Sequence, residues 1–191
     1  MQKDIYQDRY EKHQIKKKKQ LLNGNQSIKR LSKNKYTETE KKAFLRIVAN
    51  RQSQRVFTGE PISESLMNEI EVVVDKAPSS CDRKGVYIKW INDRADKEIL
   101  SGLLVGGIGW INRADKIALL FADPLAYKAP GEINFMPYLD AGVILAYITL
   151  TVELGEGKAC IVNPNIRENN KEFFKERFGD HILCGAVILG N

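Results

Sequence analysis

The sequence predicts a domain of the α+β or α/β class, in which helices and short strands surround one sheet. Its 191 residues are 43% hydrophobic and 28% charged, which is typical of a soluble domain with a substantial core. Segments with apolar residues at helical spacing alternate with short apolar runs that are typical of strands. We expect one domain over residues 37–191, which no boundary divides, preceded by an extension over residues 1–36.

Two helices are predicted near the start of this domain from their capping signals. Thr37 and Glu40 form a capping-box pattern before a helix expected over about residues 38–50. Ser63 can cap a second helix, which Pro78 ends. The second helix carries apolar residues at helical spacing that predict one buried stripe: Leu66, Met67, Ile70, Val73, Val74 and Ala77.

The remaining elements are predicted from apolar patterns. Residues 86–91 alternate as a strand does, and three short apolar runs also indicate strands, over residues 116–123, 158–162 and 185–190. Three further helices are expected, over about residues 93–105, over about residues 138–154, and over the segment with Phe173, Phe174 and Phe178.

The composition disfavours a membrane or secreted protein. The most apolar run, residues 141–152, is shorter than the ~18 residues a span needs and is interrupted by Gly142 and Tyr147, so we expect a buried helix. No apolar block follows the N-terminal lysines as a secretory signal would require. Three distant cysteines and two histidines predict neither a disulfide framework nor a metal site. We therefore expect a cytoplasmic protein with reduced thiols.

The basic charge is confined to the N-terminus. Residues 1–40 hold 11 Lys and Arg against 5 Asp and Glu, whereas residues 41–191 hold 19 of each. Such an arm could contact nucleic acid or an anionic membrane, or it could be a solvated extension. We favour the extension, because the arm has few aromatic residues to stack on bases and no base-reading motif.

Three segments could carry chemistry. Arg51, Ser53 and Arg55 alternate where the first helix gives way to a loop, and they could bind a phosphate or form ordinary surface ion pairs. The joint from Pro78 to Lys84 offers hydroxyls, amides and both signs of charge, and it could read a ligand edge or be a capped turn. Asp140, near the start of the long helix, could simply favour the helix N-terminus.

In their order and spacing, these segments resemble the nitroreductase family of flavoproteins. The family's R-x-S-x-R-x-F string is present from Arg51 to Phe57, and its P-S-S motif follows an amphipathic helix at residues 78–80. A long helix opens with D-x-G at Asp140 and ends with G-x-G at residues 155–157. Over residues 40–191, the resemblance implies an α+β fold with a central mixed sheet, flanking helices and a long buried helix.

The resemblance also implies an NAD(P)H-dependent enzyme. Family members are homodimers that bind FMN between subunits and pass a hydride from NAD(P)H to a small organic acceptor, such as a nitroaromatic compound or a quinone. Arg51 and Ser53 would hold the FMN phosphate, and Arg55 would lie near the N1 and C2 carbonyl edge of the flavin. The flavin would do the chemistry, so no catalytic side chain is assigned.

Other positions would contact the flavin ring. Pro78, Ser79 and Ser80 from the other subunit would pack along the ring, and the backbone near Asn163 and Pro164 would face N5. The segment "GGIGW" lacks a dinucleotide-binding fingerprint, so the nicotinamide would stack on the flavin. A loop over residues 123–138 could shape the acceptor pocket with Tyr127, Phe135, Met136 and Tyr138, although these residues could equally belong to the core or the dimer interface.

The sequence departs from the family pattern in three places. Asp82 and Lys84 stand where the family commonly has Asn and Gln to read the flavin edge. Glu156 replaces the leucine of the usual G-L-G, and the last predicted strand ends next to Asn191, where many members continue with a tail. These departures leave two alternatives open: a degenerate member with weak or no flavin binding that acts as an accessory protein, and, less favoured, a nucleic-acid-associated protein defined by the basic arm.

Overall fold

The computed structural model describes residues 35–128 and 131–191. The prediction for the basic arm concerns residues 1–36 and therefore lies almost entirely outside the described residues. By its internal contacts the chain divides into two units, the first ending at Arg46 and the second comprising Ile47–Asn191. The second unit contains the sheet and every residue that the sequence singled out for chemistry.

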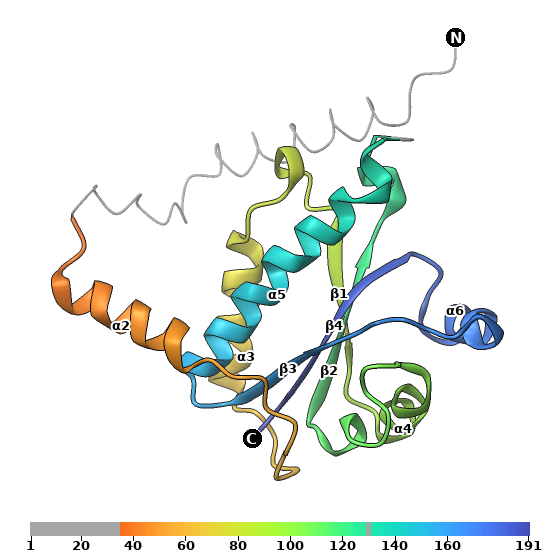
Figure 1. Cartoon of the computed structure of the whole chain (residues 1–191), viewed down its shortest axis with the longest axis horizontal. Coiled ribbons are helices and arrows are strands. Elements are labelled where there is room, and N and C mark those ends of the chain that lie inside the picture. The colour runs from red at the N-terminus through yellow and green to blue at the C-terminus, as the bar shows by residue number, and fades with distance from the viewer. Residues whose placement is uncertain (1–34, 129–130) are drawn as a thin grey trace. The chain divides into compact units, whose positions relative to one another are not determined.

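One four-stranded sheet forms the centre of this unit (Figure 1). Its strands are β1 (Val86–Ile91), β2 (Lys116–Ala122), β3 (Lys158–Val162) and β4 (Ile182–Gly190), in the order β1-β2-β4-β3. Every pair is antiparallel, so the sheet differs from the mixed sheet that the resemblance implied. Between β1 and β2 the chain returns to the end of the sheet that it left, because Ile91 pairs with Ile117.

The two middle strands are buried on both faces. Residues 117–122 of β2 are all buried, and alternate residues join different cores: Leu120 lies in one core, whereas Leu119 and Phe121 lie in the other. In β4, Leu189 and Ile188 divide between the two cores in the same way. Burial on both faces explains why these strands are continuous apolar runs in the sequence rather than alternating patterns.

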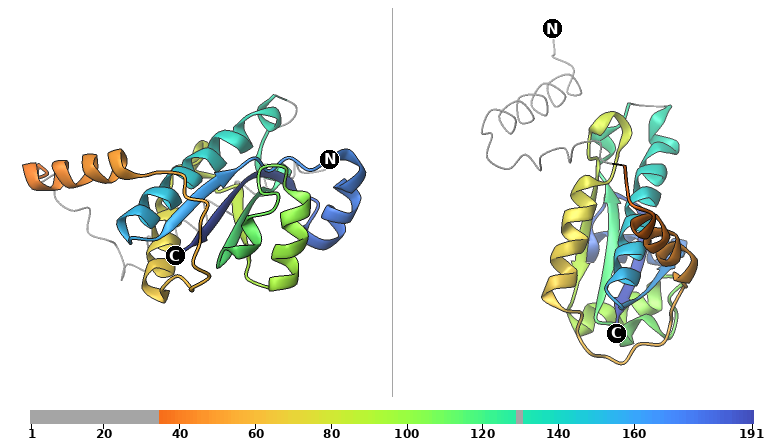
Figure 2. Two further views of the ribbon diagram at one scale, coloured as in Figure 1. Left: turned by 60° about the horizontal axis from the view of Figure 1, so that its bottom comes forward. Right: turned by 90° about the vertical axis from the view of Figure 1, so that its left-hand side faces the viewer.

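Helices cover both faces of the sheet (Figure 2). One core lies under α3 (Glu64–Lys76) and α5 (Met136–Leu154), and the other lies under α4 (Arg94–Leu103) and α6 (Lys171–Phe178). Helices on both sides of one sheet confirm the predicted α+β layering.

Helix α5 is the long buried helix that the sequence predicted. It is apolar around its whole circumference, and by length and composition alone it could cross a membrane, but half of its apolar window is buried in the fold. Its buried hydroxyls are satisfied within the helix, since Thr149 donates to the carbonyl of Leu145 at 3.0 Å and Thr151 donates to that of Tyr147 at 2.9 Å. These two buried hydroxyls therefore leave no hydrogen bond unmade.

The predicted caps of the first two helices form. In α2 (Glu38–Asn50), the Thr37 amide donates to the Glu40 carboxylate at 2.7 Å and the Glu40 amide donates to the Thr37 hydroxyl at 3.2 Å. The hydrogen bond from the Thr37 amide, and then that from the Thr37 hydroxyl to the same carboxylate oxygen, lower the pKa of Glu40. Helix α2 buries no residue, and Phe44 on its apolar side is 59% exposed. In α3, the Ser63 hydroxyl accepts from the Leu66 amide at 3.2 Å, as predicted.

Candidate functional site

The joint after α3 has an unusual backbone. Residues 80–82 form a short 3-10 turn, and Cys81, Asp82 and Lys84 have φ angles of 51°, 55° and 52°. Residues other than glycine rarely adopt this left-handed region, since it costs each of them about 1 kcal/mol or more of conformational free energy. Such residues persist only where their surroundings hold them there. We call residues 78–84 the joint loop. A loop with three such residues within four positions must be held by other contacts.

The first contact is the carboxylate of Asp140, which extends from α5. One oxygen, Oδ1, accepts from the Ser80 amide at 2.9 Å and from the Ser80 hydroxyl at 3.0 Å. The other, Oδ2, accepts from the Tyr127 hydroxyl at 3.0 Å. Asp140 is only 5% exposed and Tyr127 is completely buried. Asp140 therefore does more than favour a helix terminus: it ties α5 to the joint loop and to the segment after β2.

Arg83 supplies the second contact. Its guanidinium donates to the carbonyl of Ala126 at 2.8 Å, pairs with Glu132 at 2.7 Å and lies over the Tyr127 ring at 5.6 Å. Burial of Tyr127, and then its hydrogen bond to Asp140, raise the pKa of this phenol. The joint loop and residues 126–132 are thus joined by charged and aromatic contacts.

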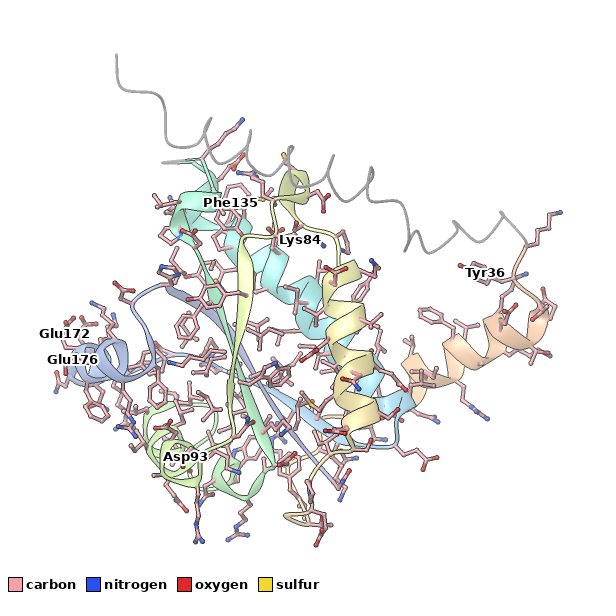
Figure 3. The ribbon with its side chains drawn as sticks, turned by 180° about the vertical axis from the view of Figure 1, so that it is seen from behind. Tyr36, Lys84, Asp93, Phe135, Glu172 and Glu176 are labelled. Atoms are coloured by element: carbon pink, nitrogen blue, oxygen red, sulfur yellow. The ribbon has the colours of Figure 1, made fainter. Side chains whose placement is uncertain are left out.

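Lys84 does not extend freely from the joint loop. Its ammonium donates to the carbonyls of Asp75 and Ala77 at 2.8 and 2.6 Å, and so caps the end of α3. The Lys84 amide donates to the Ser79 hydroxyl at 3.0 Å, and the Asp82 carboxylate lies 3.9 Å from the ammonium. Figure 3 shows Lys84 and Phe135 at the same end of the fold.

The segment after α2 presents the predicted phosphate-binding residues. The Gln54 amide donates to the carbonyl of Ala159 in β3 at 2.9 Å, which fixes this extended segment along the sheet edge. Arg51 is half-buried, and Ser53 and Arg55 are exposed. In the part of the chain that the structure describes, these three side chains have no hydrogen-bond or ion-pair partner, so the alternative of ordinary surface ion pairs is not realised there.

The turn after β3 packs against the glycine-rich segment. The carbonyl of Asn163 accepts from the Gly106 amide at 3.3 Å, and its side-chain oxygen accepts from the Asn165 amide at 3.0 Å. A Cβ on Gly106 would lie 2.5 Å from the Asn163 nitrogen, so this position requires glycine. Sequence reasoning found the glycines but not this role, which only the tertiary contact shows. Pro164 follows at the surface, half-buried.

The phosphate-binding candidates and the joint loop lie at opposite ends of α5 (Figure 1), whereas Asn163 and Pro164 follow the far end of β3. Asp140 holds the joint loop near the start of the helix, whereas Leu154 at its end leads into β3, on which Gln54 is fixed. The 14 steps from Asp140 to Leu154 correspond to ~21 Å at the rise of an α-helix. Arg51, Ser53 and Arg55 are therefore not brought together with Pro78, Ser79 and Ser80 within one chain.

The loop expected to shape an acceptor pocket divides between core and surface. Tyr127 belongs to the core, and Met136 packs partly against it. Phe135 and Tyr138, at the start of α5, are 51% and 49% exposed. The core alternative therefore holds for the first pair, and the second pair remains available at the surface.

The comparisons with known proteins agree with this architecture. No family model matches the sequence. Over 79 residues the chain is 30% identical to the FMN reductase [NAD(P)H] of Bacillus subtilis, a match that covers 41% of this chain and 31% of that protein.

Solved structures extend the similarity to most of the chain. The structure of B. megaterium NfrA2 matches with a TM-score of 0.66 and 22% identity over 78% of this chain and 65% of that one. A nitroreductase with bound FMN from Desulfitobacterium hafniense matches with a TM-score of 0.61 and 18% identity, over 78% and 88%. A nitroreductase family protein from Clostridium novyi matches with a TM-score of 0.64 and 16% identity, over 77% and 83%.

This protein has the nitroreductase fold. The fold and the α+β class that the sequence motifs predicted are therefore confirmed. The chain spans 65% of NfrA2, and its sequence match spans less than a third of the curated FMN reductase.

Proposed function

We propose that this protein is an FMN-dependent oxidoreductase that transfers a hydride from NAD(P)H to a small organic acceptor of the nitroaromatic or quinone kind. The observation that carries the proposal is the unpaired set of Arg51, Ser53 and Arg55 on a backbone fixed to β3. A guanidinium and a hydroxyl without protein partners in the described chain, those of Arg51 and Ser53, fit a phosphate, and the second unpaired guanidinium, that of Arg55, fits another electron-rich edge of the cofactor. The FMN reductase relative and the FMN-bound nitroreductase neighbour support the choice of cofactor.

The residues present would hold FMN in distinct ways. Arg51 and Ser53 would bind its phosphate, and Arg55 would place positive charge near the N1 and C2 carbonyl edge, which favours the reduced anion. The backbone near Asn163 and Pro164 would face N5. Bound FMN would supply the hydride chemistry, and the protein would supply position, charge and shielding from water.

We further propose that the site is shared between the two subunits of a homodimer. The joint loop and Arg51 lie at opposite ends of α5, so one chain alone cannot bring the joint loop against a flavin held by Arg51. The start of α5 and the residue before it also expose apolar side chains that the described chain leaves uncovered, including Phe135, Tyr138 and Leu139. A second copy would bury this surface and place its Pro78, Ser79 and Ser80 along the ring.

The alternative of a degenerate fold without flavin receives less support. Lys84 replaces an amide of the family, but its ammonium caps α3 and does not extend toward a ligand.

The cysteines Cys81, Cys160 and Cys184 are all free thiols, which suits the proposed cytoplasmic location. We propose small molecules rather than nucleic acid as the substrates.

The proposal is tested by visible absorption spectroscopy. The protein would be incubated with FMN, desalted and scanned, and then mixed with NADH or NADPH under anaerobic conditions. We expect about one FMN retained per chain, as one shared site per subunit requires, and bleaching of the flavin bands by at least one of the nucleotides. A folded protein that releases all FMN on desalting would contradict flavin binding, and retained FMN that neither nucleotide bleaches would contradict the reductase activity.

A further inference from the structure

The joint loop uses most of its own hydrogen-bonding groups to hold its shape. The Ser80 amide donates to Asp140, the amides of Asp82 and Arg83 donate to the carbonyls of Ser79 and Ser80, and the Lys84 amide donates to the Ser79 hydroxyl. Among residues 80–84, only the Cys81 amide has no acceptor in the part of the chain that is described. In the described chain, the N–H groups of Cys81 and Ser79 are therefore the two backbone donors that the joint loop leaves for a ligand, and the Cys81 N–H is the one within the left-handed turn.

One side chain from outside the loop sets its position. Asp140 is distant in sequence from Ser80, yet its Oδ1 accepts from both the amide and the hydroxyl of Ser80, at 2.9 and 3.0 Å. Its Oδ2 accepts from the Tyr127 hydroxyl, so three donors, the amide and hydroxyl of Ser80 and the hydroxyl of Tyr127, share one buried carboxylate. Ser80 directly precedes Cys81, so the carboxylate that fixes the Ser80 amide also fixes the direction of the next N–H.

Arg83 alone cannot replace this contact. Its guanidinium donates to the carbonyls of Ser80 and Ala126 and pairs with Glu132, but it has only donors and cannot accept from the Ser80 amide or hydroxyl. Removing Asp140 would leave the amide and the hydroxyl of Ser80 without an acceptor and would remove the contact from α5 that holds the left-handed residues Cys81 and Asp82 in place. A charged side chain that fixes a strained ligand-facing loop preorganises a site.

We propose that Asp140 is a positioning residue for flavin binding, because it holds Ser80 so that the Cys81 N–H and the face of the joint loop meet the isoalloxazine ring. This inference rests on the proposed function. Asp140 does not touch the cofactor: it acts through Ser80, and its loss is felt as a displaced loop. The family resemblance identifies Asp140 only as the first residue of the D-x-G motif and gives it no role in the flavin site.

The experiment compares Asp140→Ala with a control on the same helix. Thr149→Val removes a buried hydroxyl whose hydrogen bonds stay within α5, so it perturbs the same core without touching the loop. Three quantities would be measured in the full-length protein: amide hydrogen exchange of residues 80–84, the dissociation constant for FMN, and the reduction potential of the bound flavin. Asp140→Asn keeps the volume and one accepting oxygen, and it serves if the alanine variant does not fold.

We expect Asp140→Ala to lose exchange protection at Ser80 and at residues 82–84, to bind FMN at least tenfold more weakly, and to shift the flavin potential. We expect Thr149→Val to match the parent protein in all three, and Asp140→Asn to fall between. Unchanged exchange in a folded Asp140 variant would overturn the anchoring role. Lost protection with unchanged FMN affinity and potential would overturn the positioning role. If the parent protein binds no FMN, the proposed function fails, while the exchange data still decide the anchoring.

Discussion

If the site is shared between two subunits as proposed, two variants that each lose FMN should restore FMN binding when they are combined. Arg51→Ala removes a guanidinium that has no protein partner in the described chain, so we expect the free energy of unfolding to change by less than about 0.5 kcal/mol. A charge-assisted hydrogen bond is worth about 1.5–3 kcal/mol, so FMN should bind about 10- to 150-fold more weakly. Arg94→Ala removes an exposed arginine on α4 and serves as the matched control, with FMN affinity unchanged.

The second variant alters the other group of residues. Pro78→Glu places a longer, charged side chain on the exposed edge of the joint loop, where the ring of a flavin held by the other subunit would pack. Alone, it should also lose FMN. In a heterodimer of the two variants, one site carries both changes and the other carries none.

Mixing the two variants after unfolding and refolding should therefore restore FMN binding. With random pairing, half of the dimers are heterodimers with one intact site in two, so about a quarter of the chains should retain FMN after desalting. The assay is flavin absorbance per chain, with each variant refolded alone as the control. No recovery above the two separate variants would refute the argument that the two ends of α5 serve different sites.

Three further predictions concern single positions. Gly85→Ala should lower the free energy of unfolding in urea by about 1–3 kcal/mol, because the added Cβ would lie 2.8 Å from the Tyr127 ring. Gly102→Ala, whose Cβ would have no atom within 4 Å, should instead stabilise α4. Equal urea midpoints for the two variants would contradict this packing. Lys84→Met should lower the free energy of unfolding by about 1 kcal/mol and change FMN affinity less than threefold, and the reverse result would place the ammonium at the flavin. The hydrogen bond from the Lys128 amide, and then that from Arg83, hold the pKa of Glu132 below its ordinary value of 4.5. The ionised carboxylate therefore stabilises the fold above that pH, and this stability is lost as the pH falls through the lowered pKa. In Glu132→Gln, the free energy of unfolding should accordingly depend less on pH between about pH 6 and 3.

Elements with local signals were predictable from the sequence. The Ser63 cap and Pro78 bracket α3 almost to the residue, and the alternating segment at residues 86–91 is β1. The long helix starts at Met136 rather than at residue 138, because Pro137 occupies the first turn, where a proline is tolerated. Local chemistry decides where such elements begin and end, so a single sequence suffices.

The arrangement of these elements was not predictable in the same way. The strand order and the antiparallel pairing depend on where the helices return the chain, which no local pattern records. The contact between Asp140 and Ser80 joins residues 60 positions apart, and the direction of the Lys84 ammonium depends on the end of another element. The predicted set Arg51, Ser53 and Arg55 came from a motif, and only the structure shows that these side chains are left unpaired in the described chain.

The left-handed backbone of the joint loop also limits how this sequence can vary. At Asp82 and Lys84, with φ near 50°, asparagine, aspartate or glycine is accommodated, whereas valine or isoleucine is excluded by its branched Cβ. The exchange of asparagine for aspartate at position 82 is therefore conservative for the chain trace, although it alters hydrogen bonding. In a set of related sequences, substitution at these two positions should follow backbone tolerance first and ligand chemistry second.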